Sequence, residues 1–180
     1  SFSLDGRWLA TASFDGTARI WDGQTGQPLG APLVQAHPVV DVEFTSDSRR
    51  IITASGESVP IPLAQIWDVA TGQAIGPPLA HNLTIATAVF SHDGRLVATA
   101  SSDQSAQIWN AATGQRIVPP LRHASVVTSA TFSADDRLFL TTSSDFTPRV
   151  WDASTGEPVT PPLAHAAQVP FGAWSPDGNE

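Results

Sequence analysis

Short runs in which apolar residues alternate with polar ones, or follow each other directly, recur along the chain. The segments "TARIW" (17–21) and "SAQIW" (105–109) alternate, whereas "LVATAS" (96–101) and "LFLTTS" (138–143) are apolar runs rich in small and β-branched residues. Alternation with a period of two is typical of half-buried strands, and short apolar runs of the second kind are typical of buried strands. A helical period is absent throughout, so the pattern predicts an all-β fold.

Turn and edge signals separate these runs. Asp-Gly pairs at 5–6 and 93–94 favour tight turns between strands. The run "QRIVPPL" (115–121) contains two prolines, which have no N–H to donate, and this predicts an edge strand. Pro148 stands where the third strand of the last unit should start, so strand pairing there should begin late.

One phrase recurs five times: an aromatic residue, Ser or Thr, any residue, then Asp. It begins at residues 2, 44, 90, 132 and 174, at spacings of 42, 46, 42 and 42. Other marks keep the same period: Trp-Asp or Trp-Asn at 21, 67, 109 and 151, Thr-Gly at 25, 71, 113 and 155, and a leucine at 33, 79, 121 and 163. Four short strands in each repeat of about 40 residues predict the blades of a β-propeller.

The sequence resembles the WD-repeat β-propellers across essentially its whole length. The resemblance rests on the Trp-Asp pairs, on Ser-x-Asp steps beginning at residues 13, 101 and 143, and on a histidine before each new unit. It implies four four-stranded antiparallel blades in a single propeller or half-propeller domain, residues 1–180. The repeats run approximately over residues 1–43, 44–89, 90–131 and 132–173.

Residues 169–180 restart a first strand, and the opening "SFS" is only the tail of one. The last strand could therefore complete the first blade, within one chain or between two copies. A four-bladed ring would turn each blade by about 90° instead of about 45°, beyond the usual tolerance of close-packed faces. We therefore expect a homo-oligomer, a dimer that closes an eight-bladed ring. The other alternative is that these residues are part of a longer propeller.

The resemblance also implies a hydrogen-bonded chain inside each blade, from Trp to a Ser or Thr hydroxyl, then to His, then to Asp. The implied sets are His81, Ser101, Asp103 and Trp109; His123, Ser143, Asp145 and Trp151; and His165 with Ser13, Asp15 and Trp21. The same residue types could suggest a Ser–His–Asp hydrolase. Because the set recurs in successive units, a structural role is favoured and no catalytic residue is assigned.

The second unit departs from this pattern. It has four extra residues within "ASGESVPIPLAQIWD" (54–68), it loses the turn Asp, and Gln35 takes the position of His81. We expect its hydrogen-bonded set to be broken. The insertion, with Val59 and Ile61, could be a recognition loop or neutral drift.

A possible binding rim for protein partners is formed by the turns that follow the second strand of each unit. Its candidate residues are Phe14, Gln104, Phe146, Val59 and Ile61. Exposed aromatic residues can anchor a partner, or they can pack against the next blade.

Composition narrows the remaining possibilities. The net charge is −8, and the nine basic residues, all Arg, form no basic run, which argues against nucleic-acid binding. The chain has no apolar run long enough to cross a membrane. It has no Cys, and its histidines are spread over separate units, so we expect neither a metal site nor a cofactor. A cytoplasmic location is favoured.

The sequence thus predicts a non-enzymatic scaffold for protein–protein interaction. One alternative is a propeller fragment, natural or engineered, whose main property is self-assembly. A more remote one is the sensor part of a bacterial signalling enzyme, because "ATGQRIVPPLRH" (112–123) resembles such arrays and the richness in Ala, Pro and Arg suggests a bacterial coding bias.

Overall fold

The computed structural model describes residues 1–56 and 62–175, and it contains only strands, turns and loops over these ranges. The strands are β1 (Trp8–Ala12), β2 (Thr17–Asp22), β3 (Leu33–Val34), β4 (Val39–Phe44), β5 (Arg50–Ser55), β6 (Leu63–Asp68), β7 (Ala74–Ala80), β8 (Ile85–Phe90), β9 (Leu96–Ser101), β10 (Ser105–Asn110), β11 (Leu121–Arg122), β12 (Val127–Phe132), β13 (Leu138–Ser143) and β14 (Arg149–Asp152). Val59 and Ile61, predicted for the rim, lie outside the described residues.

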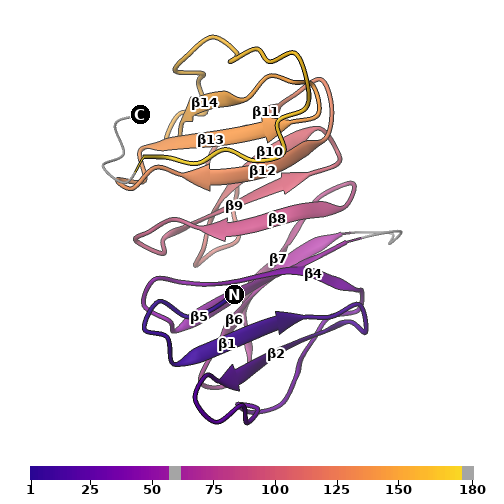
Figure 1. The fold of residues 1–180 in the computed structure, drawn as a ribbon, viewed down its shortest axis with the longest axis vertical. Coiled ribbons are helices and arrows are strands. Elements are labelled where there is room, and N and C mark those ends of the chain that lie inside the picture. Colours follow the sequence, from indigo (N-terminus) through magenta and orange to yellow (C-terminus); the bar gives the residue numbers. More distant parts are fainter. Residues whose placement is uncertain (57–61, 176–180) are drawn as a thin grey trace.

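These strands form four antiparallel sheets, one for each repeat, which confirms the all-β propeller architecture. Blade one contains β1 to β3, blade two β4 to β7, blade three β8 to β11, and blade four β12 to β14. Within each sheet, strands that are consecutive in the sequence lie next to each other. Figure 1 shows the four sheets stacked along the long axis, with blade one at the bottom and blade four at the top.

The outermost strands of blades three and four are short. In blade three β11 contains only Leu121 and Arg122, directly after Pro119 and Pro120, and in blade four the fourth strand is reduced to a bridge between Trp151 and Pro158. In blade two, by contrast, β7 has seven residues although it contains Pro77 and Pro78. The third strand of blade four starts at Arg149, directly after Pro148, and has four residues where its counterpart β10 has six. Pairing therefore begins late, as the missing N–H predicts.

The apolar core is divided among the spaces between neighbouring blades. One cluster joins blades one and two, a second joins blades two and three, and a third joins blades three and four. Phe139, Ile51 and Ile108 are among the largest side chains that are fully buried in these clusters. Each such burial contributes roughly 1.5–3 kcal/mol, so most of the stability comes from blade-to-blade contact.

The first strands of successive blades follow each other along one side of the array. β8 packs against β4 and β5, and β12 packs against β8 and β9. Residues 168–175 continue this series beside β12 and β13 (yellow in Figure 1), although they do not form a regular strand. Trp174 Nε1 donates to the carbonyl of Thr131 over 3.3 Å, and Gln168 Nε2 donates to Ser144 Oγ over 3.2 Å. This segment lies where the first strand of a further blade would lie.

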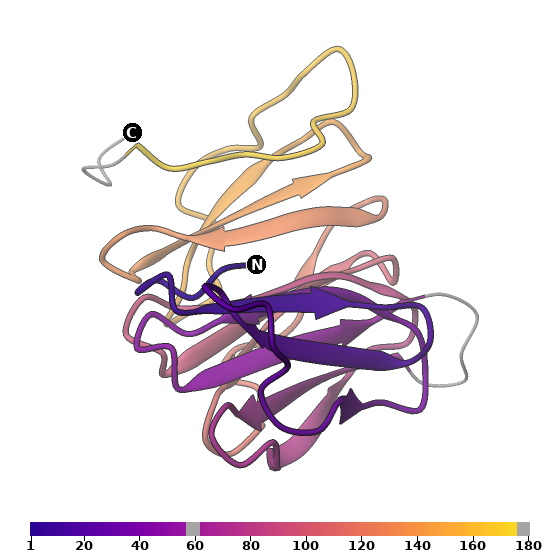
Figure 2. The ribbon, with the colours of Figure 1, turned by 60° about the horizontal axis from the view of Figure 1, so that its bottom comes forward.

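The array does not close on itself. Blade one and the segment 168–175 lie at opposite ends of the long axis (Figure 1). In Figure 2, where the bottom comes forward, no other sheet lies over blade one. β1 pairs with β2 on one side, and on its other side it meets only the opening residues through a bridge between Phe2 and Leu9.

Candidate functional site

The strongest polar constellation lies in blade three. Trp109 Nε1 donates to Thr99 Oγ1 over 2.9 Å, and Thr99 Oγ1 lies 2.7 Å from His81 Nε2. His81 Nδ1 lies 2.9 Å from Asp103 Oδ2. Because the carboxylate can only accept, Nδ1 carries the proton, and Nε2 accepts from the threonine hydroxyl. The four side chains thus form one continuous chain of hydrogen bonds.

Blade four repeats this constellation with nearly the same dimensions. Trp151 Nε1 donates to Thr141 Oγ1 over 2.8 Å, Thr141 Oγ1 lies 2.8 Å from His123 Nε2, and His123 Nδ1 lies 2.9 Å from Asp145. In both blades the centroids of the His and Trp rings are 6.1 Å apart in an edge-on arrangement. A set that recurs at this precision in consecutive blades has the geometry of a structural unit.

The hydroxyl in these sets corrects the sequence prediction, because Ser101 and Ser143 do not supply it. Ser101 Oγ donates to the carbonyl of Leu83 and accepts from the amide of Asp103, so it closes the turn at the end of β9. In the register of the sheet Trp109 pairs with Val97, which places Thr99 one diagonal step away and Ser101 two further residues along the strand.

A threonine occupies this position in all four blades, as Thr11, Thr53, Thr99 and Thr141, and this repeated residue was the signal that could have identified it.

The charges in the sets agree with this arrangement. Burial alone would raise the pKa of the Asp103 carboxyl, but hydrogen bonds from His81 and Ser105 outweigh it and hold that pKa well below its usual range. At His123 burial lowers the pKa and outweighs the opposite effect of Asp145. In blade four a neutral His123 beside an ionised Asp145 keeps the hydrogen-bond direction fixed. Thr99 is 0% exposed, so its hydroxyl is out of reach of a substrate.

Blade two keeps half of the set. Gln35 lies at the histidine position, and its Nε2 donates to Thr53 Oγ1 over 2.8 Å. Trp67 Nε1 donates to the same hydroxyl, also over 2.8 Å. The expectation of a broken set was therefore only partly right: the amide replaces the imidazole at the hydroxyl, while Gln35 Oε1 is buried without a hydrogen-bond partner among the described residues.

Blade one has no histidine in its set. Trp21 Nε1 donates to Thr11 Oγ1 over 2.9 Å, and the Asp15 carboxylate accepts from the backbone and hydroxyl of Thr17. Ser13 Oγ accepts from the amide of Asp15. His165 is exposed near blade four, where its backbone amide donates to the carbonyl of Phe146. The single chain therefore does not bring His165 to Asp15, because the two lie at opposite ends of the open array.

The described rim residues lie on equivalent turns of three blades. Phe14 is 74% exposed and Phe146 is 42% exposed, and Gln104 is exposed as well. Gln104 and Phe146 adopt φ angles of 67° and 66°, in the left-handed region where Gly16 stands in blade one. A bulky side chain in that region is strained by on the order of 1–3 kcal/mol, and such outliers concentrate at sites with a function.

Two carboxylates that the sequence analysis missed join blades two and three. Asp41 Oδ2 accepts from the amide of Ala88 over 3.0 Å, and Glu43 Oε2 accepts from the amide of Phe90 over 3.2 Å. Both amides lie on β8, so β4 caps part of the free edge of its neighbour. The equivalent residues of β8 are Thr87 and Val89, which carry no charge.

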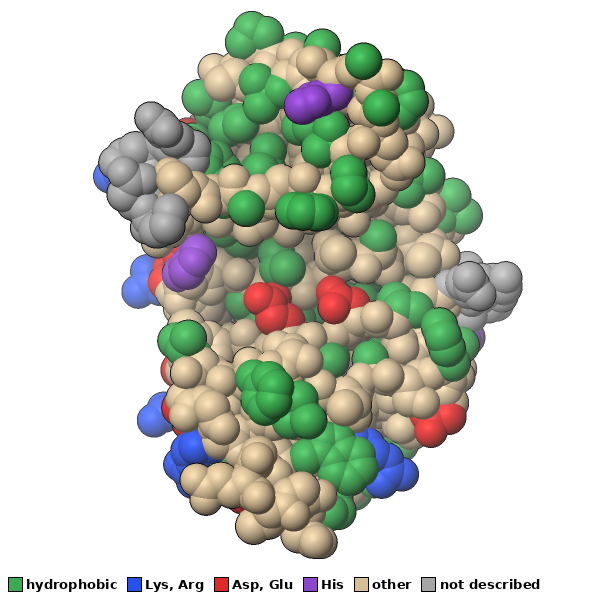
Figure 3. All heavy atoms as spheres, in the orientation of Figure 1, with side chains coloured by type: hydrophobic (Ala, Val, Ile, Leu, Met, Phe, Trp, Pro, Cys, Tyr) green, Lys and Arg blue, Asp and Glu red, His purple; other side chains and the backbone are tan. Residues whose placement is uncertain are grey.

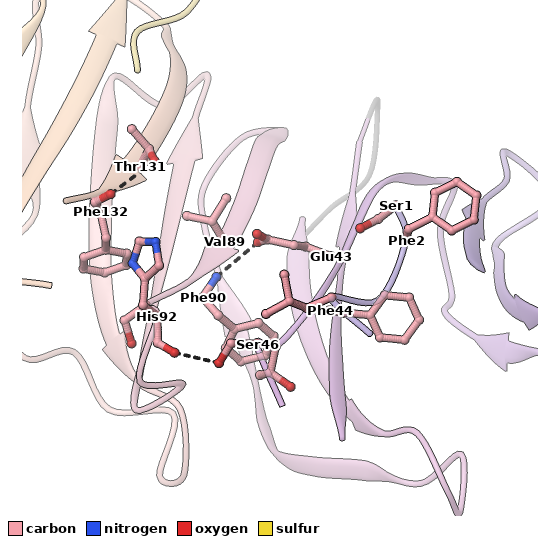
Figure 4. Close-up of a pocket in the computed structure, with 13 residues that line it drawn as sticks. Ser1, Phe2, Glu43, Phe44, Ser46, Val89, Phe90, His92, Thr131 and Phe132 are labelled. Atoms are coloured by element: carbon pink, nitrogen blue, oxygen red, sulfur yellow. Dashed lines mark hydrogen bonds between the residues drawn. The ribbon is translucent and has the colours of Figure 1, made fainter. Parts of the chain in front are cut away.

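Glu43 lies in the hollow along the first strands. Figure 3 shows acidic side chains at the centre of this face, and Figure 4 shows Glu43 directed at Phe90 in a cavity of about 320 Å³. Burial raises the pKa of Glu43 to about 7, more than the hydrogen bond from Phe90 lowers it. Burial also raises the pKa of Asp41, against the hydrogen bonds from Ala88 and Val42.

The described part of the chain contains no helix long and apolar enough to cross a membrane. Over the same residues, His, Asp and Glu side chains do not gather in groups of three or more that could hold a metal ion.

Comparisons with known proteins support the repeat architecture. The family model "WD domain, G-beta repeat" matches residues 1–22, 77–110 and 118–152. A segment of 55 residues, 31% of the chain, is 40% identical to the transcriptional corepressor LEUNIG_HOMOLOG of Arabidopsis thaliana, and it spans 7% of that protein. The crystal structure of the computationally designed Ika8 protein superposes with a TM-score of 0.79 at 22% identity, over 91% of this chain and 48% of that chain. That likeness shows a shared fold, and the chain spans less than half of each of these two proteins.

Replacing Asp103 by Ala should destabilise the protein. The change leaves the buried Nδ1–H of His81 without its acceptor, which costs on the order of 1–3 kcal/mol in the free energy of unfolding. Urea denaturation measures this loss. Asp47→Ala is the matched control, because Asp47 also accepts from a threonine hydroxyl and a backbone amide, those of Thr45 and Arg49, and has no histidine partner. Equal losses from the two variants would show that the bond to histidine contributes nothing.

Replacing Glu43 by Gln should change how stability depends on pH. The pKa of Glu43 is raised in the folded state, so its contribution to stability is fully present below its ordinary value of 4.5 and is lost as the pH rises to about 7. The amide stays neutral and can still accept from Phe90. Glu43→Gln should therefore be more stable than the native chain above pH 7, by on the order of 2–3 kcal/mol, and the difference should shrink toward pH 4.5.

Urea denaturation at several pH values gives this difference. The exposed Glu157 provides the control, since Glu157→Gln also removes one carboxylate from the chain. A stability difference for Glu43→Gln that does not change between pH 4.5 and 7 would contradict the assignment.

Proposed function

The chain belongs to the family of WD domains with G-beta repeats, and on that basis we propose that it is a non-catalytic scaffold for protein–protein interaction whose first partner is a second copy of itself. The matched plant protein is named as a transcriptional corepressor. The match covers 7% of that protein, so we do not transfer that activity.

The proposal of a non-catalytic role rests on the burial of the residues whose types resemble a catalytic triad. The residues of the apparent Ser–His–Asp combination lie in two buried hydrogen-bonded sets. The hydroxyl group in these sets belongs to Thr99 or Thr141, and each of these threonines is 0% exposed. A nucleophile must be reached by its substrate, and the hydroxyl here is shared between an indole and an imidazole. The exposed turns with Phe14, Gln104 and Phe146 remain as the candidate surface for other protein partners.

The observation that carries self-assembly is the complementarity of the two ends of the array. At one end the outer edge of β1 is met, among the described residues, by the short segment 1–3. At the other end, residues 168–175 lie in the position of a first strand without a sheet of their own. An unpaired strand edge attracts a strand from another chain. We propose that residues 169–175 of each copy complete blade one of the other.

Side-chain burial favours the same pairing. Phe171 is 73% exposed, and Leu163 is 45% exposed. In blade one Thr11 is exposed and Trp21 is only half-buried, although the equivalent Trp109 and Trp151 are buried. Covering this face with blade four of a second copy would bury both surfaces, and it would bring His165 to Asp15. A two-fold arrangement gives eight blades, and two-fold symmetry is the commonest among homo-oligomers.

The 180-residue chain should have twice its chain mass of 18.9 kDa in solution. Truncation after Ala164 should reduce it to a single-chain mass, because it removes the strand that fills blade one. Truncation after Ser175 is the matched control and should leave the assembly intact. Sedimentation equilibrium measures these masses.

Gln104→Asp, which alters the rim in blade three away from both ends of the array, should also keep the double mass. A single-chain mass for the intact protein at micromolar concentration would overturn the proposed self-assembly. It would leave a scaffold that binds only other proteins.

A further inference from the structure

Three equivalent grooves lie between neighbouring blades. Each is lined on one side by the first residue of the second strand of one blade, and on the other side by the turn before the second strand of the next blade. The residues that mark these two sides are Trp8 with Ser48, Arg50 with Gly94, and Leu96 with Asp136. The groove between blades one and two and the groove between blades three and four have volumes of about 580 and 560 Å³, whereas the middle groove has about 240 Å³.

The middle groove holds an arginine side chain of the chain itself. Arg50 extends from β5, and its Nη2 donates to the carbonyl of Gly94 over 2.8 Å. Its guanidinium carbon lies 5.5 Å from the centroid of the Phe90 ring. A guanidinium group suits both contacts, because it is planar, donates in fixed directions and packs on an aromatic face. Arg50 therefore shows how an arginine side chain fits a groove of this kind.

The two open grooves present the same backbone acceptor without a donor. The carbonyls of Ser48 and Asp136 stand at the position of the Gly94 carbonyl, and they accept no hydrogen bond from the described residues. Trp8 and Leu96, on the opposite side of these grooves, do not donate to them. The turns also have the same backbone conformation, since the φ angles at 48, 94 and 136 are 59°, 67° and 60°.

Carboxylates in the open grooves favour a positively charged occupant. Asp68 and Asp152 line these grooves at the position where the middle groove has Asn110. Hydrogen bonds lower the pKa of both carboxyls, chiefly from Thr71 at Asp68 and from Ser154 at Asp152, so both stay ionised. These bonds end on Oδ1 of each carboxylate. Among the described residues Oδ2 has no donor, and it can accept from an incoming group.

The arginine that already lines the outer part of a groove does not exclude a second one. Arg95 lines the middle groove together with Arg50, and its Nε lies 3.7 Å from Asp93. Arg137 has the same relation to Asp135, over 3.9 Å, at the groove between blades three and four. The carboxylate of its own turn thus balances the outer arginine, and the inner part of the groove keeps room for a further guanidinium group.

We infer that each of the two open grooves accepts an arginine side chain from a basic segment of a partner protein, in the position that Arg50 fills in the middle groove. The net charge of −8 favours the approach of such a segment. A second copy of this chain does not supply it, because its nine arginines form no basic run. The inference names a class of partner for the scaffold role proposed above and rests on that role, but it does not depend on self-assembly.

A short peptide with one arginine between lysines tests this inference, and the same peptide with lysine in place of the arginine is its matched probe. Isothermal titration calorimetry on the 180-residue chain should give two sites for the arginine peptide. The lysine peptide has the same charge but lacks the planar donor group, so we expect its dissociation constant to be about tenfold higher, as for the loss of one charge-assisted hydrogen bond.

Two substitutions should change the number of sites. Leu96→Arg places an internal arginine at the groove between blades three and four and should leave one site; Gln115→Arg, which adds the same charge to an exposed turn of blade three, is its control. Arg50→Ala should open the middle groove and give three sites, with Arg19→Ala, at an exposed position on β2, as its control. Urea transitions show whether each variant is folded, and if Arg50→Ala is not, Leu96→Arg decides the question.

The outcomes separate this inference from the proposed self-assembly. Equal dissociation constants for the two peptides, or a number of sites that Leu96→Arg does not lower, would show attraction to surface charge alone and overturn the inference. Failure of the native chain to bind the arginine peptide also overturns it. The mass of the same samples is measured by sedimentation equilibrium. A double mass without peptide binding leaves the self-assembly standing, and a single-chain mass with two arginine sites leaves the grooves standing.

Discussion

Each sheet of this protein can bury its faces only against another blade, and this constraint governs the rest of the structure. The three apolar clusters all lie between neighbouring sheets, and none is contained within a single blade. A sheet at the end of the array therefore lacks cover on one face. The effect is visible in the repeated Trp-Thr pair: Trp109 and Trp151 are buried against the preceding blade, whereas Trp21, which has no preceding blade in the chain, is half-buried and its partner Thr11 is exposed.

Burial between blades also constrains the polar groups, because each buried donor needs an acceptor in its own blade or in the neighbouring blade. In blades three and four the histidine comes from the connection before the first strand and bonds to the turn before the third strand, so the set ties that connection to the sheet. Asp41 and Glu43 do the corresponding work between blades, by accepting from backbone amides of β8. Their burial leaves Glu43 with a pKa of about 7, which is the cost of capping a strand edge with a carboxylate in a closed space.

Sequence periodicity predicted the strands and blades because every unit repeats the same turn and Trp marks, and the late start of β14 followed from Pro148 alone. Sequence periodicity did not predict which side chains form hydrogen bonds, because that depends on the register of the paired strands. Thr99, and not Ser101, meets Trp109, since only the diagonal neighbour in the pairing comes within hydrogen-bond distance. The bonds of Glu43 were invisible for a related reason: its acceptor role depends on β8, a strand of another blade some 47 residues away in the chain.

Comparison of the blades distinguishes the hydrogen bonds that form within one sheet from those that require a neighbouring blade. The bond from Trp to Thr is present in all four blades, as Trp21, Trp67, Trp109 and Trp151 each donate to the threonine on the neighbouring strand. The bond from the threonine to a histidine is not present in every blade. In blade two Gln35 bonds to Thr53 instead, and in blade one neither a histidine nor a glutamine side chain bonds to Thr11. The Trp-Thr bond lies within one sheet, between its second and third strands, so every blade can form it alone. The histidine reaches its sheet from the connection with the preceding blade, and among the described residues the connection that follows blade four carries His165, at the other end of the array from Asp15.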